Sequence, residues 1–300
     1  MEIIDRQIHF GPGGIAETIA AMDAIGISAV MIDEWWIKTP NDPHYAVGPG
    51  IQRRPSPTAE LAAWQYPDRF SYLLRIDHRD PELDSLVRQA RDATHCRALR
   101  VSPGMSRDAV AKFAAGDYAP VFRAAAENGL PVFTMVAGNT ELIGRYLDDF
   151  PDLKVIICHT GMPPGRLMRP VIMKLEGLPD SEAHWNKVGE EPLDKAFDRV
   201  LKMADRPNVA MKWAHASTMF DSPGYPNAGT WPWLRKAINA FGADRIMFGT
   251  DYTVNLTGES WAELVFSIRA NPDLSDEERE WIFAKTARKW LNWPTAQEMA

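Results

Sequence analysis

Eight short apolar runs recur along the 300 residues of this chain, and longer segments of helical character separate them. The runs are rich in Val, Ile and Met, which indicates strands buried on both faces, as in a parallel sheet. The segments between them, such as 16–25 and 120–128, are amphipathic. The runs are 3–9, 29–33, 70–76, 96–101, 131–136, 155–159, 209–213 and 245–251. Eight repeated strand–helix units predict an α/β fold, a (β/α)8 TIM barrel.

The length of the chain suits one such barrel with insertions. A TIM barrel takes about 250 residues, so a single domain over 1–300 is expected. Two Pro-rich stretches exceed what a minimal barrel needs, namely 35–65 after the second strand and 163–193 after the sixth. We expect these insertions to form lids or interfaces, and a homodimer is possible on the same grounds.

Composition excludes several classes of protein. The net charge is −7 and no Lys/Arg run is present, so nucleic acid is not an expected partner. No run reaches the ~18 apolar residues of a membrane span, and the start of the chain lacks a basic segment followed by an apolar one. The two cysteines, Cys96 and Cys158, both lie in apolar runs, which argues against a disulfide scaffold. A cytoplasmic protein with no membrane partner is expected.

Five positions close predicted strands: Gln7, His9, Met135, His159 and Asp251. In an α/β barrel the carboxyl ends of the strands meet at one face, where the loops carry the chemistry. These five side chains are therefore expected to gather at one barrel mouth.

Several segments carry a family resemblance that spans nearly the whole chain. The opening Asp5-Arg6-Gln7-Ile8-His9 resembles the Asp-x-His-x-His start of the amidohydrolase-related family, with Gln7 where the first histidine would stand. The segment His159-Thr160-Gly161 resembles the family's sixth-strand His-x-Gly, and 244–252 resembles its eighth strand. The resemblance implies a TIM-barrel hydrolase or decarboxylase, which in most relatives carries a metal.

The resemblance also implies a ligand set that this chain holds only in part. Two first-strand histidines, a fifth-strand histidine and an eighth-strand aspartate would bind the metal, but Gln7 and Met135 occupy two of these places. An amide and a thioether are poor zinc ligands. We therefore expect no metal cofactor, and Gln7 and Met135 would instead contact substrate. The alternative is one divalent metal, zinc or manganese, held by His9, Asp251 and Gln7.

Without a metal, acid and base chemistry must come from side chains. Asp251 is predicted to be the general base, with His159 and His9 as its catalytic partners. Family relatives supply the precedent, because pyrone-dicarboxylate lactonases are understood to use the eighth-strand aspartate without metal. Other relatives are non-oxidative decarboxylases, in which a metal orients the acid. Here an arginine would have to hold the carboxylate.

Basic residues on the predicted strands could hold that carboxylate. Arg100 shares a strand face with Ala98, opposite Arg97, so Arg100 is expected to point into the barrel. There it would either grip a substrate carboxylate bidentately or pair with an acidic neighbour. Lys212 on the seventh strand has the same two interpretations. A Schiff base is chemically possible at a buried lysine, but a structural ion pair is favoured over it.

Loop residues that follow strands are further candidates for substrate contact. Trp35 and Trp36 leave the second strand together and are suited to stack on a flat ring, although tryptophans also pack in lids and interfaces. His78 and His215 follow strands near the mouth, and either could face the pocket.

Two classes of function remain. The favoured one is an enzyme that acts on a small aromatic or dicarboxylic compound by hydrolysis or non-oxidative decarboxylation. The alternative is a noncatalytic, degenerate relative that serves as a binding or interaction protein. The presence of His9, His159 and Asp251 together favours the enzyme, because a buried carboxylate beside imidazoles is costly without a role.

Overall fold

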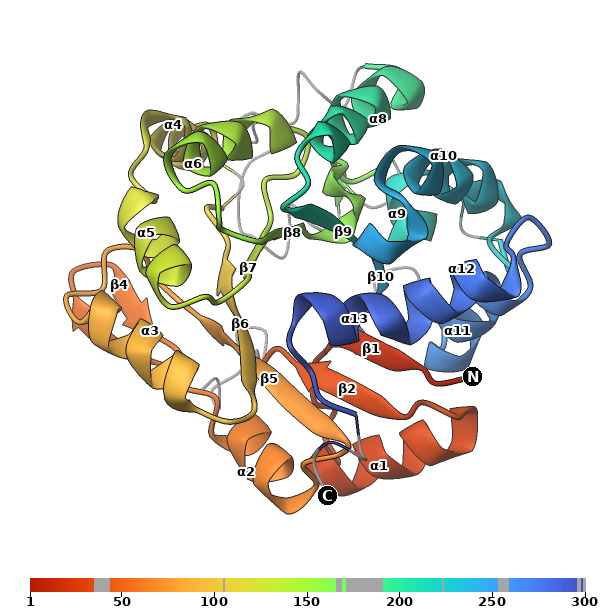
Figure 1. Cartoon of the computed structure of the whole chain (residues 1–300), viewed down its shortest axis with the longest axis horizontal. Helices are drawn as coiled ribbons and strands as arrows, with labels where there is room; N and C mark the ends of the chain where they lie inside the picture. The colour runs from red at the N-terminus through yellow and green to blue at the C-terminus, as the bar shows by residue number, and fades with distance from the viewer. Residues whose placement is uncertain are drawn as a thin grey trace.

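The computed structural model describes residues 1–34, 44–104, 106–165, 169–170, 191–222, 224–252, 259–295 and 298. An eight-stranded parallel sheet curls into a nearly closed barrel, and the helices form a ring outside it (Figure 1). In sheet order its strands are β1 (Ile4–Ile8), β2 (Ala29–Ile32), β5 (Phe70–Arg75), β6 (Cys96–Val101), β7 (Val132–Thr134), β8 (Val155–Ile157), β9 (Val209–Trp213) and β10 (Ile246–Phe248). Each of the eight predicted runs contains one of these strands, which confirms the predicted (β/α)8 TIM barrel.

The helices between and after the strands are short, and two of them show how particular residues set a helix end. They are α1 (Gly14–Ile25), α2 (Pro57–Gln65), α3 (Leu83–Asp92), α4 (Arg107–Ala115), α5 (Ala119–Glu127), α6 (Gly144–Asp149), α8 (Leu193–Leu201), α9 (Ala216–Met219), α10 (Trp231–Phe241), α11 (Trp261–Arg269), α12 (Asp276–Glu280) and α13 (Thr286–Trp290). Gly26 ends α1 with a left-handed φ of 77°, as a helix C-cap requires. Ser275 and Glu278 form a capping box that starts α12.

The first insertion contains a small hairpin. Strands β3 (Tyr45–Gly48) and β4 (Ile51–Arg53) pair antiparallel ahead of α2. Most of the second insertion lies outside the described residues. Within the described parts of the chain, no helix combines the length and apolar character needed to cross a membrane.

Two apolar layers hold the barrel together. The larger lies between the strands and the surrounding helices. The smaller fills the barrel interior and includes Ile4, Ala29, Met31, Leu73, Ala98, Phe133, Ile156, Cys158, Ala210 and Met247. Both cysteines are buried as free thiols. Because side chains fill the barrel interior, a functional site is expected at the ends of the strands.

The barrel closes where its first and last strands meet. Backbone hydrogen bonds run from Asp251 N to Gln7 O (2.8 Å) and from His9 N to Tyr252 O (2.6 Å), and Ile8 forms a parallel bridge with Tyr252. Gln7, His9 and Asp251 therefore come together across this seam.

Two buried side chains of β1 reinforce the seam. The carboxylate of Asp5 accepts hydrogen bonds from the Thr250 backbone N (2.9 Å) and hydroxyl (2.5 Å). The guanidinium of Arg6 donates to the carbonyls of Phe248 (3.0 Å) and Ile282 (2.9 Å). These bonds connect the start of the chain to segments more than 240 residues later.

Candidate active site

Polar side chains form a layer directly above the apolar interior. Alternate residues of a strand face the same side, so the residue two positions after an interior apolar residue also points inward. The pairs are Met31 and Asp33, Leu73 and Arg75, Ala98 and Arg100, Phe133 and Met135, and Ala210 and Lys212. In β1 a register shift between Asp5 and Ile8 interrupts this alternation, and Gln7 and His9 both reach the inner face.

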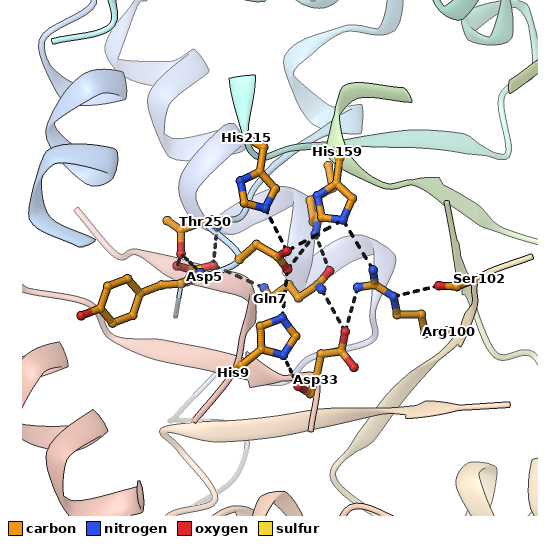
Figure 2. A network of polar contacts seen from close by, with 12 residues as sticks. Asp5, Gln7, His9, Asp33, Arg100, Ser102, His159, His215 and Thr250 are labelled. Atoms are coloured by element: carbon orange, nitrogen blue, oxygen red, sulfur yellow. Dashed lines mark hydrogen bonds and ion pairs between the residues drawn. The ribbon is translucent and has the colours of Figure 1, made fainter. Parts of the chain in front are cut away.

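Asp251 is the centre of the cluster. Its Oδ2 lies 2.9 Å from Nε2 of His215 and 3.9 Å from Nε2 of His159. Its Oδ1 lies 3.4 Å from Nε2 of His9 and 3.7 Å from Nζ of Lys212. Figure 2 shows His9, His159 and His215 converging from different strand ends. Three imidazoles and one ammonium thus surround a single buried carboxylate.

The charges of this cluster are strongly coupled. Burial alone would raise the pKa of Asp251, but the Lys212 ammonium and the hydrogen bonds from His215 and His9 together hold it well below its usual range. Burial and the nearby Lys212 charge lower the pKa of His159 well below its usual value. At neutral pH, Asp251 is therefore an ionised carboxylate and His159 a neutral imidazole.

Asp33 is a second buried carboxylate, at the end of β2. It accepts hydrogen bonds from Nε (2.5 Å) and Nη2 (2.6 Å) of Arg75 and from Nη1 of Arg100 (2.8 Å). Burial would raise the pKa of Asp33, but the two guanidinium groups outweigh it and lower the pKa to about 2. This carboxylate holds Arg75 and Arg100 in fixed positions at the mouth.

Gln7 joins the two carboxylate clusters. Its amide Nε2 donates to Asp33 (2.9 Å), and its Oε1 accepts a hydrogen bond from Lys212 Nζ. Figure 2 shows the contact between the Gln7 amide and Asp33. Both polar ends of Gln7 are thus engaged by charged side chains. Among the described residues, this network contains three lysine or arginine side chains (Lys212, Arg75 and Arg100) and the carboxylates of Asp33 and Asp251.

The backbone at the centre of the site is strained. His159, His215 and Asp251 have φ values of 50°, 54° and 60°, in the left-handed region that non-glycine residues adopt uncommonly. Each such residue costs about 1 to 3 kcal/mol and persists where the surrounding structure imposes it, often at functional sites. All three residues turn sharply just after a barrel strand ends, which aims their side chains at a common point.

The structure brings most of the sequence-predicted residues together. His9, His159, His215, Asp251, Lys212, Gln7 and Arg100 share one connected network. Met135 is half-buried against the interior apolar layer. His78 stands apart, stacked on Tyr118 beside a neighbouring cavity. Trp35 and Trp36 lie outside the described residues.

The sequence interpretation did not assign a role to Asp33, which connects Arg75, Arg100 and Gln7. The alternation of side chains within β2 could have predicted that Asp33 points inward, because Asp33 stands two residues after the interior Met31. Arg100 pairs with this acidic neighbour, which was one of its two predicted roles. Lys212 likewise lies in ion-pair range of Asp251.

The site contains donor atoms of the kind that hold a divalent metal. Within the described residues, one group of three offers ligand atoms that lie within 4.8 Å of one another: His159, His215 and Asp251. However, Lys212 Nζ already lies 3.7 Å from the same carboxylate, and the amide of Gln7 is engaged at both ends. Two unit charges 4 Å apart interact by about 4 kcal/mol at an effective dielectric of 20, and an ion of charge two doubles this. A divalent ion held by His159, His215 and Asp251 would therefore have to compete with Lys212 for the Asp251 carboxylate.

Comparison with known proteins establishes the family. The amidohydrolase family model matches residues 52–293, which is most of the chain, so the protein belongs to the amidohydrolase family. No curated protein matched the sequence.

Solved structures with the same fold come from several bacteria. An amidohydrolase from Burkholderia multivorans with bound zinc has a TM-score of 0.71 at 19% identity, and the match covers 98% of this chain and 100% of that one. A protein from Pseudomonas putida, provisionally named 2-pyrone-4,6-dicarboxylic acid hydrolase, has a TM-score of 0.64 at 18% identity over 97% and 98%. A 5-carboxyvanillate decarboxylase from Novosphingobium aromaticivorans with bound manganese has a TM-score of 0.58 at 14% identity over 97% of each chain. At these identities the likeness establishes the fold.

Proposed function

We propose that this protein is a metal-independent hydrolase of a small carboxylate-bearing ring compound, with Asp251 as general base. The observation that carries the proposal is the placement of one ionised, buried carboxylate among His9, His159, His215 and Lys212 at the barrel mouth. A buried carboxylate is a candidate base when its partners hold it ionised and oriented. The provisional name of the Pseudomonas putida neighbour agrees with this reaction class.

His215, Lys212 and Arg100 have separate parts in the proposed reaction. His215, at 2.9 Å, orients the carboxylate. The carboxylate takes a proton from the attacking water as the new C–O bond forms, and returns it to the leaving oxygen as the acyl C–O bond breaks. Lys212 and Arg100 place positive charge where the carbonyl oxygen becomes anionic. Lys212 also keeps the pKa of Asp251 low, which makes Asp251 a weak base in the free protein. When the developing oxyanion draws Lys212 towards itself, Asp251 becomes a stronger base at the moment of attack.

The cationic side chains of the mouth support an anionic substrate. Lys212 and Arg100 both place a buried positive charge beside the Asp251–His159 centre, which favours a substrate of negative charge. Arg100 is the best placed of these cations, because its Nη2 lies 3.5 Å from Nε2 of His159, beside the reacting centre.

The strained backbone argues against the noncatalytic alternative. Three residues in the left-handed region, all aimed at one point, are costly to maintain. Buried charges add to this cost unless they are paired. A barrel kept for its shape alone has no physical need for either feature.

Solvent labelling would test the reaction class directly. Carboxylated lactones and aryl esters would be screened in H2 18O with protein dialysed against chelator. Hydrolysis requires one 18O atom in the new carboxylate, whereas decarboxylation would release CO2 and place solvent deuterium on carbon in D2O. We expect 18O incorporation at an unchanged rate after chelation, with metal content checked by plasma mass spectrometry.

The matched variants are Asp251→Asn and Asp244→Asn. Asp244 is an exposed partner of Lys289 just before β10 begins, at the opposite end of the barrel. We expect Asp251→Asn to fold normally and lose turnover by at least about 10²-fold, while Asp244→Asn keeps wild-type turnover. Retention of turnover by Asp251→Asn would reject Asp251 as the base. Loss of turnover on chelation, restored by zinc or manganese, would reject metal independence.

A further inference from the structure

The backbone turn that carries Asp251 is held from the outer side of the barrel by Asp5. The residue before Asp5 points into the apolar interior, so Asp5 itself points the other way, towards the surrounding helices. Its carboxylate is fully buried there. Four donors bind it: the backbone N of Gln7 (3.3 Å), the backbone N of Thr250 (2.9 Å), the Thr250 hydroxyl (2.5 Å) and Nε1 of Trp261 (2.8 Å).

These hydrogen bonds fix the residue that precedes Asp251. Thr250 is held through its backbone and its side chain at once, by the two oxygens of one carboxylate. Hydrogen bonds to a carboxylate are stronger than those between neutral groups. Figure 2 shows Thr250 in contact with Asp5 on the side of the turn away from His159 and His215.

Trp261 holds the residue that follows Asp251. It is the first residue of α11, where a capping box starts the helix, and its ring stacks on Tyr252 with centroids 5.0 Å apart and planes 11° from parallel. The backbone N of Tyr252 also donates to the Thr250 hydroxyl (3.1 Å). Both chain neighbours of Asp251 are therefore attached to the same buried pair, Asp5 and Trp261.

The turn needs such support because its backbone conformation is unfavourable. Asp251 has a φ of 60°, and a residue with a Cβ atom stays in this region only where its surroundings impose it. If the turn relaxed, the carboxylate would move relative to Nε2 of His215, which now lies 2.9 Å from it. The position of the carboxylate thus depends on contacts made by its neighbours in the chain.

We propose that Asp5, Thr250 and Trp261 are positioning residues, which hold Asp251 in its left-handed turn and so aim its carboxylate at the reacting centre. The inference rests on the proposed function for the role of Asp251. The three side chains are 0%, 2% and 4% exposed, and they act from behind the strand ends. Their loss should therefore lower kcat and leave KM nearly unchanged.

The His215 ring reports the position of the Asp251 carboxylate, because the two are hydrogen-bonded. The ring nitrogen signals of protein labelled with 15N-histidine would be recorded at one pH near neutrality and assigned with His215→Gln. Thr250→Val and Trp261→Phe each remove one donor to Asp5 and keep the shape of the side chain. They are preferred to Asp5→Asn, which alters the buried acceptor itself and endangers folding. In both, we expect the His215 signal to move at least half of the way to its position in Asp251→Asn.

Two further variants separate positioning from general loss of stability. Thr250→Ser keeps the hydroxyl and should keep the wild-type signal. Thr286→Val is the matched control, because it removes another fully buried threonine hydroxyl, which donates to the carbonyl of Ala243 (3.1 Å) just before β10 begins. It should leave the His215 signal in place although it also destabilises the fold.

Kinetics give the second measurement, with a substrate from the solvent-labelling screen. We expect kcat to fall by roughly 10- to 100-fold in Thr250→Val and Trp261→Phe, as for a small misplacement of a reacting group. Thr250→Ser should restore most of the loss, and Thr286→Val should turn over like the wild type at temperatures well below its Tm.

Two results would overturn the proposal: a His215 signal that stays in place in both Thr250→Val and Trp261→Phe, or an equal shift in Thr286→Val. The spectra need no substrate, so they decide the question independently of turnover. An active Asp251→Asn variant would end the proposed function and leave the spectroscopic result standing. An unmoved His215 signal would end only the positioning proposal.

Discussion

Replacement of Asp33 by asparagine should destabilise the barrel measurably. Asp33 is fully buried and accepts three short hydrogen bonds from two guanidinium groups. Asparagine retains one acceptor and the shape of the side chain but removes the charge. Arg75 and Arg100 would then remain at the mouth without their counter-ion.

The size of the effect can be estimated in two ways. The pKa of Asp33 falls from 3.8 to about 2, and at 1.36 kcal/mol per pKa unit this corresponds to roughly 2.5 kcal/mol. Breaking a buried ion pair by removing one partner typically costs about 3 to 5 kcal/mol. For 300 residues the unfolding entropy near the midpoint is about 0.6 kcal/mol/K. A loss of about 2.5 to 5 kcal/mol therefore lowers Tm by about 4 to 8 °C.

Thermal and urea unfolding followed by circular dichroism would measure this loss. Asp244→Asn, at an exposed ion pair, is the control and should change stability by less than about 0.5 kcal/mol. The contribution of Asp33 is present above pH 4 and is lost as the pH falls towards 2, because its folded pKa is depressed. The difference between Asp33→Asn and wild type should therefore shrink over that interval. A Tm within 1 °C of wild type at pH 7 would refute the reasoning.

Two further predictions follow from the same electrostatics. Lys212→Met removes the ammonium beside Asp251, and we expect turnover to fall at least tenfold and zinc affinity to rise, measured by calorimetry; unchanged zinc affinity would mean that Lys212 does not oppose a metal. Arg235 lowers the pKa of Glu278 to about 2, so Glu278 stabilises the fold above pH 4.5 and less as the pH falls towards 2. Glu278→Gln should therefore weaken the loss of stability between pH 5 and pH 3 in urea unfolding, and a parallel pH profile would contradict this.

The strands could be predicted from the sequence because a parallel barrel buries each strand on both faces, which leaves continuous apolar runs. The positions at which the strands end could be predicted in the same way, so the sequence alone placed His9, His159 and Asp251 at one barrel mouth. Alternation within a strand correctly turned Arg100 inward, and the same rule applied to β2 indicates Asp33.

These rules could not predict the contacts that side chains make between one strand and another. The amide of Gln7 bridges Lys212 and Asp33 because a register shift in β1 turns Gln7 towards both, and nothing in the residue types reveals that shift. His215 reaches Asp251 through a left-handed backbone turn. The presence of a histidine in the sequence does not predict that backbone conformation.

Because the barrel closes between β1 and β10, the residues of the site cannot come together until synthesis has passed the last strand. During synthesis the chain emerges from its amino end, so Gln7 and His9 leave the ribosome some 240 residues before Asp251. The carbonyl of Ile282, which accepts a hydrogen bond from Arg6, is synthesised later still. A nascent chain can therefore form the early strand–helix units, but the three residues meet only when the ring closes. With Asp251 as the proposed base, activity requires a complete barrel, and we expect a fragment ending before β10 to have neither.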